Sequence, residues 1–303
     1  MTRRGFLGAV ALAAGPMPII DTHIHLFDPT RPQGVPWPDP KNETLYKPAL
    51  PGRYRTVAGP FGITGAIAVE CSPLAEDNQW LLDAAARDPV IVGVVGNLEP
   101  DDAAFGKRLE TLRRNPLFLG IRYGNLWGRD LGAQLAKPRF VDGMRAAAAA
   151  GLALDSANPN EALLGALLRL KREVPDLRLV IDHLPQMNLA DDRYPAVLSE
   201  IARLPAVWIK ISEVLRRVDG RVRLDHGFYK TRLDALFELF GPDRVMYGSD
   251  WPNSDQWAPY KDVFDVVRNY MDKQEGSVRE RFFWKNSVAA YRWKKRQADQ
   301  PGD

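Results

Sequence analysis

The stretch Pro18-Ile19-Ile20-Asp21-Thr22-His23-Ile24-His25-Leu26 opens the regular part of the sequence. Its first half is apolar and β-branched, and its second half carries two histidines at a spacing of two. Such a run is typical of a buried strand that ends at a polar site. Seven more short apolar runs follow, at residues 65–71, 90–98, 118–123, 152–156, 179–184, 207–212 and 245–250.

Longer stretches with helical periodicity alternate with these runs. They cover residues 76–87, 101–114, 139–150, 160–173, 194–203, 229–240, 260–271 and 278–294. Alternating strands and helices predict βαβ units with a parallel sheet, and eight strands suit a closed (β/α)8 TIM barrel. A doubly wound open sheet is the alternative, but no glycine-rich phosphate loop follows the first strand.

The composition fits one catalytic domain over residues 16–303. The 303 residues are 45% hydrophobic and 26% charged, with a formal net charge of +3. Barrels of roughly 250 residues fold as single domains. The basic tail Arg292, Lys294, Lys295 and Arg296 is interpreted as a solvated helix end, so we expect no nucleic-acid partner. Cys71 is the sole cysteine, which leaves histidine and carboxylate as the ligands for any metal.

Residues 1–15 differ from the rest of the chain. Arg3-Arg4 precedes the short apolar run 8–14, and together they resemble a twin-arginine (Tat) export signal with Ala11 and Ala13 near a cleavage edge. A cytoplasmic N-terminus that happens to contain two arginines is the alternative. No other stretch approaches the ~20 apolar residues of a membrane span, so we expect a mature form without membrane contact, periplasmic if exported.

Two segments are too long for simple connections in a barrel. Residues 28–55 follow the first predicted strand, are rich in proline and carry Trp37 and Tyr46; residues 125–138 follow the fourth and carry Trp127 and Arg129. Loops after barrel strands lie at the catalytic end. We therefore expect both segments to form walls or a lid over one mouth.

The strongest chemical signal lies at the ends of three predicted strands. His23 and His25 are two apart, so both side chains are expected to face the barrel axis. Asp250, in Gly248-Ser249-Asp250-Trp251-Pro252, ends the eighth run, and His183, in Asp182-His183, ends the sixth. These four residues are the predicted metal ligands, with Asp155 as a further candidate, and Asp182 is expected to orient a ring from behind.

Other rim residues are candidates for binding substrate. Arg122 ends the fourth run and offers a forked donor, although pairing with a structural carboxylate is an alternative. Lys210 shares one side of the seventh run with Trp208 and Ser212, and would polarise a bound oxygen. Weaker candidates are Trp251 as a pocket wall, Tyr123, Glu70, and His226, for which surface placement and substrate contact stay open.

Together these pieces resemble the amidohydrolase-related family of TIM-barrel hydrolases, in its branch of sugar lactonases and pyrone-dicarboxylate lactonases. The matching pieces are Asp21-Thr22-His23-Ile24-His25, Gly120-Ile121-Arg122, Asp182-His183, Lys210-Ile211-Ser212, Gly248-Ser249-Asp250-Trp251-Pro252 and Trp284-Lys285-Asn286. In this family the fifth strand commonly supplies a metal-binding histidine or modified lysine, whereas here it carries Asp155. The resemblance therefore implies zero or one divalent ion, with zinc favoured.

The resemblance implies hydrolysis of a small cyclic ester, the lactone of a sugar acid or a related carboxylate. Asp250 is expected to act as general base on water, and the catalytic set is completed by His183 and Arg122, with Lys210 holding the substrate. Two alternatives remain: a metal-dependent decarboxylase of aromatic or unsaturated acids, and a non-catalytic binding protein. The sequence leaves assembly open, with a homodimer as one possibility.

Overall fold

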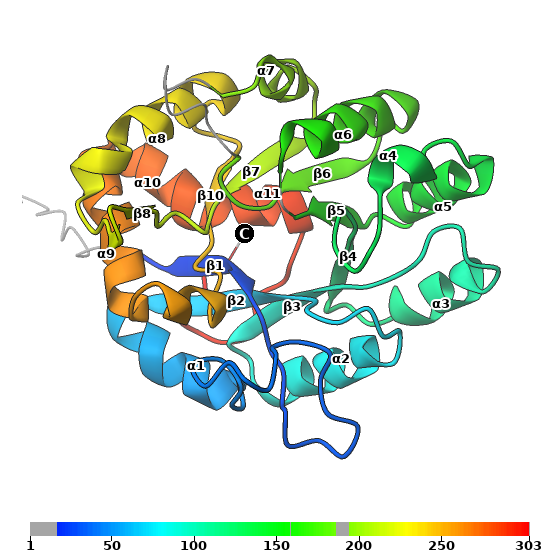
Figure 1. Ribbon diagram of the computed structural model, residues 1–303, viewed down its shortest axis with the longest axis horizontal. Coiled ribbons are helices and arrows are strands. Elements are labelled where there is room, and N and C mark those ends of the chain that lie inside the picture. The colour runs from blue at the N-terminus through cyan, green and yellow to red at the C-terminus, as the bar shows by residue number, and fades with distance from the viewer. Residues whose placement is uncertain (1–16, 158, 186–193, 303) are drawn as a thin grey trace, which may run out of the picture.

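The computed structural model describes residues 17–157, 159–185 and 194–302. Eight parallel strands lie in chain order around one sheet, with helices outside them (Figure 1). The strands are β1 Ile19–Ile24, β2 Ile63–Val69, β3 Ile91–Gly96, β4 Phe118–Arg122, β5 Ala153–Ser156, β6 Arg178–Ile181, β7 Val207–Ile211 and β10 Val245–Tyr247. The predicted (β/α)8 barrel is confirmed.

The ring of helices covers the outer face of the sheet. The helices are α1 Pro51–Ala58, α2 Asp77–Arg87, α3 Phe105–Leu112, α4 Leu131–Gln134, α5 Pro138–Ala149, α6 Glu161–Glu173, α7 Ala196–Ala202, α8 His226–Phe240, α9 Tyr260–Met271, α10 Gly276–Glu280 and α11 Asn286–Tyr291, and of these α11 lies at the amino end of the barrel and not in the outer ring. A π-helical segment, Arg281–Lys285, joins α10 to α11, and a small hairpin, β8 Arg217–Val218 and β9 Arg221–Val222, follows β7. In the described part of the chain no helix has the length and apolarity that a bilayer span requires.

Two helix predictions need correction. Residues 28–55 were expected to be an irregular insertion, but α1 begins at Pro51, where a proline suits the first helical turn. Residues 278–294 were expected to be one helix, but regular α-helix gives way to the π segment and ends at Tyr291, because Arg292 has a left-handed φ of 59°. The proposed export segment 1–15 lies outside the described residues.

The barrel closes between its first and last strands. The amide of His25 donates to the carbonyl of Trp251 at 2.7 Å, and the amide of Asp250 donates to the carbonyl of His23 at 2.9 Å. These bonds lie beyond the end of β10, at the carboxyl end of the barrel. The closure therefore brings His23, His25 and Asp250 together by backbone pairing.

An irregularity in β1 decides which way its polar residues face. Ile20 packs in the barrel interior, whereas the Asp21 carboxylate accepts hydrogen bonds from Tyr54 of α1 and Tyr260 of α9, on the helix side. Strict alternation would turn His23 to that side as well. The pairing of β1 with β2 shifts register between Asp21 and Ile24, and this bulge turns His23 back toward the axis.

The opposite end of the barrel is closed by the C-terminal segment. Ala290 and Tyr291 of α11 join the interior cluster, and the Gln300 side chain donates to the carbonyls of Thr64 and Pro89. Figure 1 shows this end of the chain crossing the ring of strands. The amino end is thus sealed, which leaves the carboxyl end for a cavity.

Gly248 allows β10 to pass close to β1. A Cβ added at this position would lie 2.8 Å from the Cβ of His23 and 3.2 Å from that of Ser212. We expect Gly248→Ala to lower the free energy of unfolding by about 1–3 kcal/mol, because backbone must shift in a packed core. Urea denaturation followed by circular dichroism measures this.

Gly52→Ala is the matched control for Gly248→Ala. Gly52 lies in α1 with no atom within 4 Å of an added Cβ, so alanine there should leave stability unchanged or raise it by about 0.5–1 kcal/mol. Equal stability for the two variants would contradict the close approach at Gly248.

Candidate active site

A cavity of about 150 Å³ opens at the carboxyl end of the barrel. Its walls come from six strand ends and from both long loops, as the sequence predicted for the two loops. The lining residues are His25, Trp37, Cys71, Arg122, Leu126, Trp127, Ala157, His183, Asp250 and Asn253. Polar side chains and two tryptophans line this cavity together, a combination that suits a small polar ring.

His23, His25 and Asp250 form a buried donor group. The Nε2 atoms of His25 and His23 lie 3.2 and 3.6 Å from Asp250 Oδ1, and one ligand atom from each residue falls within 4.8 Å of the others. His25 Nδ1 lies 3.0 Å from the Val69 carbonyl, which accepts a hydrogen bond from this nitrogen. In the neutral tautomer with this Nδ1 proton, His25 Nε2 carries a lone pair and faces a carboxylate oxygen that also carries only lone pairs.

This donor group fits a divalent metal ion. Two electron-rich atoms 3.2 Å apart repel unless a cation lies between them, and His23 Nε2 and Asp250 Oδ1 have no hydrogen-bond partner among the described residues. Burial lowers the pKa of the His23 imidazole well below its usual value, so the ring stays neutral and free to coordinate. Imidazole nitrogen with one carboxylate is a zinc-type donor set.

Asp250 is held in an unusual backbone conformation. Its φ is 60°, in the left-handed region that an aspartate rarely adopts. The hydrogen bond from its backbone amide to the His23 carbonyl holds this conformation. Burial alone would raise the pKa of its carboxyl, but His183, His25 and His23 together hold that pKa well below the usual range. Asp250 is therefore an anion, and Asn253 donates to its other oxygen at 2.7 Å.

His183 lines the cavity but does not belong to the donor group. Its φ is 68°, and its Nδ1 lies 3.0 Å from the Ser212 hydroxyl. The ring lies 4.6 Å from that of His23, centroid to centroid. Of the predicted metal ligands, the structure brings together three, and it leaves His183 at the wall with a ring that can contact a bound molecule.

Arg122 faces the cavity and also pairs with a structural carboxylate. Its Nε donates to Glu70 Oε1 at 2.8 Å, and a second nitrogen donates to the Glu70 carbonyl. Trp127 Nε1 lies 3.3 Å from the other Glu70 oxygen. The pairing of Arg122 with a structural carboxylate is thus confirmed, and because Arg122 also lines the cavity, its contact with substrate stays a prediction.

Lys210 does not reach the cavity, which corrects its expected role in holding substrate. Its Nζ lies 2.7 Å from Asp155 and 2.9 Å from Asp182, and all three side chains are fully buried. Burial opposes its charge, but the two carboxylates outweigh burial and raise the pKa of Lys210. Asp155 is therefore an ion-pair partner, and it does not belong to the donor group that was expected to include it.

The two carboxylates beside Lys210 differ. Burial outweighs the ammonium at Asp155 and raises its pKa to about 7. At Asp182 burial also acts to raise the pKa, but Lys210 and His23 hold it well below the usual value. Asp182 Oδ1 lies 3.5 Å from His23 Nδ1, so the residue expected to orient a ring lies behind His23.

Three weaker candidates lie away from the cavity. Trp251 is fully buried with its ring 5.3 Å from that of Tyr54, so it packs under α1 and forms no pocket wall. Tyr123 follows Arg122 and therefore points outward, against Phe140 of α5. His226 begins α8 and is half-buried outside the cavity lining.

Two residues of the site were not assigned roles from the sequence. The Asp21 carboxylate accepts hydrogen bonds from the amides of Ser249 and His23, at 2.8 and 3.2 Å, and so ties together the segments that carry the donor group. Asn253 binds Asp250 from three residues further along. Asp21, two residues before the histidine pair, was a sequence signal that could have been used. The turn that brings Asn253 back to Asp250 could not be predicted from the sequence.

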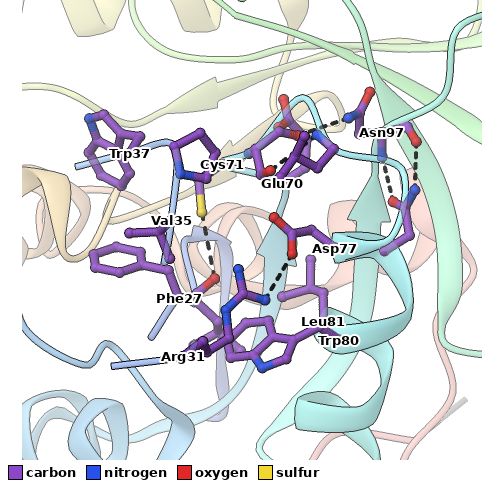
Figure 2. A pocket seen from close by; sticks show the side chains of 15 residues that line it. Phe27, Arg31, Val35, Trp37, Glu70, Cys71, Asp77, Trp80, Leu81 and Asn97 are labelled. Carbon is purple, nitrogen blue, oxygen red and sulfur yellow. Dashed lines mark hydrogen bonds and ion pairs between the residues drawn. The ribbon is translucent and has the colours of Figure 1, made fainter. Parts of the chain in front are cut away.

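A second, smaller cavity of about 20 Å³ adjoins the first. Figure 2 shows its apolar side chains, including Phe27, Trp80 and Leu81, and Trp37 and Cys71 line both cavities. Arg31 pairs with Asp77 of α2 at 2.8 Å and lies over the Trp80 ring. This pair ties the long loop after β1 to α2, and so fixes Trp37 beside His25.

Cys71 provides a test of this packing. Burial is the largest effect that raises the pKa of its thiol, and the neighbouring Glu70 carboxylate raises it further. Because the thiolate is the reactive form, Ellman's reagent at pH 8 should react with the native protein at least about tenfold more slowly than with the unfolded protein. Equal rates would show that the wall at Cys71 is open to solvent.

Comparisons with known proteins agree with this geometry. A family model described as amidohydrolase matches residues 20–293. An L-fucono-1,5-lactonase of Burkholderia ambifaria is 30% identical over 254 residues, which cover 78% of this chain and 80% of the relative. An L-fucono-1,5-lactonase of Burkholderia multivorans is 28% identical over 291 residues, covering 89% and 94%.

A crystal structure of an amidohydrolase from Burkholderia multivorans with bound zinc superposes with a TM-score of 0.81. It is 25% identical in sequence, and the match covers 91% of this chain and 99% of that one. The likeness extends over nearly the whole of both chains.

Proposed function

The chain belongs to the amidohydrolase family, and on that basis we propose that it hydrolyses the lactone of a sugar acid, with L-fucono-1,5-lactone as the first substrate to test. The observation that carries the proposal is the buried group of His23, His25 and Asp250, which opens on a cavity sized for a small ring. The activity of both relatives supports the choice of a lactone.

We propose that His23, His25 and Asp250 hold one divalent ion, zinc in the first instance. The zinc-bound neighbour and the unpartnered donor atoms support this assignment. When bound, such an ion polarises a carbonyl oxygen and lowers the pKa of a bound water.

The side chains divide the remaining work. Asp250, an anion at the cavity, takes a proton from the attacking water as the water oxygen bonds to the carbonyl carbon. The ring C–O bond then breaks, and the proton passes to the departing ring oxygen, which leaves an open-chain hydroxy acid. His183 lies at the wall where it can hydrogen-bond an oxygen of the ring.

Arg122 and the two tryptophans position the substrate. The Arg122 guanidinium, fixed by Glu70, offers N–H donors to a hydroxyl or carbonyl oxygen. Trp37 and Trp127 present aromatic surface to the C–H faces of a sugar ring. The polar and apolar walls thus match the two kinds of surface on a hydroxylated lactone.

Asp250→Asn tests the proposed base. We expect the variant to lose about 10²- to 10⁴-fold in kcat on L-fucono-1,5-lactone, because the amide cannot accept the proton of water. A pH-indicator assay measures the turnover. Asp219→Asn is the control, since Asp219 also has a left-handed φ, of 49°, but lies exposed in the turn between β8 and β9.

Near-full activity of Asp250→Asn would refute the assignment of the base. If wild type turned over no lactone and instead released carbon dioxide from aromatic acids, the decarboxylase would replace the lactonase. The metal is tested separately, by chelation with zinc content measured on the same sample. Activity that is lost when zinc is removed and restored when zinc is added back would support the ligand assignment. Full activity of the zinc-free protein would argue against it.

We also propose that residues 1–15 direct export through the Tat route. A twin lysine in place of Arg3 and Arg4 should abolish export of the full chain, because that route requires the arginine pair. Fractionation of cells that express each form measures it. Equal export of both forms would contradict the Tat assignment, and retention of both forms in the cytoplasm would make the cytoplasm the site of action.

A further inference from the structure

A second set of charged groups lies directly beneath the donor group. Lys210 of β7, Asp155 of β5 and Asp182, just after β6, are each 0% exposed. None of them lines the cavity. They come from three neighbouring strands and converge on one point near the barrel axis, so they form a layer under the candidate metal site.

The surroundings of the Lys210 ammonium resemble those of a metal ion. Its Nζ lies 2.7 Å from Asp155 Oδ2, 2.9 Å from Asp182 Oδ1 and 3.3 Å from His23 Nδ1. Two carboxylate oxygens and one imidazole nitrogen are ligands that divalent ions use in proteins. Tyr291 completes the layer, since its hydroxyl donates to Asp155 Oδ2 at 2.8 Å and its ring lies under Nζ.

His23 connects the two layers. Its Nε2 faces Asp250 and the cavity, whereas its Nδ1 faces Lys210 and Asp182. A cation above His23 and a cation below it would therefore share one imidazole. The ammonium of Lys210, a residue of β7, already fills the position below His23.

We propose that the Lys210 ammonium is a built-in cation that occupies the inner half of the centre, so that the protein accepts one exchangeable divalent ion and not two. Lys210 fills the space between Asp155 and Asp182 and offsets part of their negative charge, which removes the room and weakens the attraction for a second ion. It also holds Asp182 behind His23, with Asp182 Oδ1 3.5 Å from His23 Nδ1.

Removal of the lysine side chain should create the second site. We expect Lys210→Ala to bind one more equivalent of zinc per chain than wild type. In this variant the Asp155 and Asp182 carboxylates and His23 Nδ1 surround the space that the ammonium has left, and all three are zinc ligands. Equilibrium dialysis with metal analysis gives the stoichiometry, and anomalous diffraction from zinc-soaked crystals shows where each ion lies. Ions outside the barrel are not counted.

Two control variants separate this effect from a general loss of buried charge. Lys210→Ala with Asp155→Asn removes one ligand and should return the stoichiometry to that of wild type. Lys171→Ala removes another buried lysine, whose ammonium donates to the carbonyls of Pro175 and Leu177. Among the described residues, Asp176 is the one carboxylate that acts on this ammonium, in place of the pair at Lys210, so this variant should gain no ion.

Wild type provides a test that does not depend on the folding of a variant. Crystals of the unaltered protein soaked in excess zinc should show at most one ion in the barrel. A second anomalous peak within about 4 Å of the first would overturn the proposal. So would a folded Lys210→Ala variant with the wild-type stoichiometry.

The inference rests on the proposed metal site but not on the lactone. A protein that hydrolyses no lactone would still show the difference between wild type and Lys210→Ala, and a lactonase that binds two ions in its wild-type form would contradict the inference alone. The two proposals can therefore fail separately.

Discussion

The pairing of the first strand with the last is the interaction on which the site depends. Two backbone hydrogen bonds, from His25 to Trp251 and from Asp250 to His23, close the barrel and at the same time place the donor atoms within reach of one another. Asp21 reinforces the closure, because its carboxylate accepts from the amides of both segments and from two tyrosines of the helical ring. The same hydrogen bonds that close the barrel therefore also assemble the site.

The second constraint is the balance of buried charge. An unpaired charge in a barrel interior costs several kcal/mol, and here each charged side chain near the axis has an opposite partner. Arg122 is paired with Glu70, and Lys210 with Asp155 and Asp182. Among the described residues of the centre, His23 Nε2 and Asp250 Oδ1 are buried without a hydrogen-bond partner, as are Asp155 Oδ1 and Asp182 Oδ2, and the first two are the atoms that the proposed ion would contact.

The sequence predicted the barrel and the ends of its strands well, because apolar β-branched runs between amphipathic stretches leave little freedom. It also predicted the convergence of His23, His25 and Asp250, since the carboxyl ends of parallel strands meet at one face. It failed where direction depends on tertiary contacts. Lys210 lies on the inner side of β7, as strand alternation requires. Alternation does not say how far along the barrel axis the ammonium lies, and the two aspartates below the cavity hold it there. The prediction of Trp251 as a pocket wall was wrong because β10 ends at Tyr247, so strand alternation does not decide where the Trp251 side chain points.

The identity of residue 155 follows from the same charge balance. Asp155 is held from below by Tyr291, on the helix that seals the amino end of the barrel, and from the side by Lys210. A histidine at this position, as the fifth strand of related barrels often has, would leave the ammonium with one carboxylate and the tyrosine hydroxyl without its acceptor. The lysine on β7 and the aspartate on β5 are thus linked choices. If Lys210 is the inner cation that we propose, a chain that carries this pair holds a fixed positive charge where a second ion would otherwise bind.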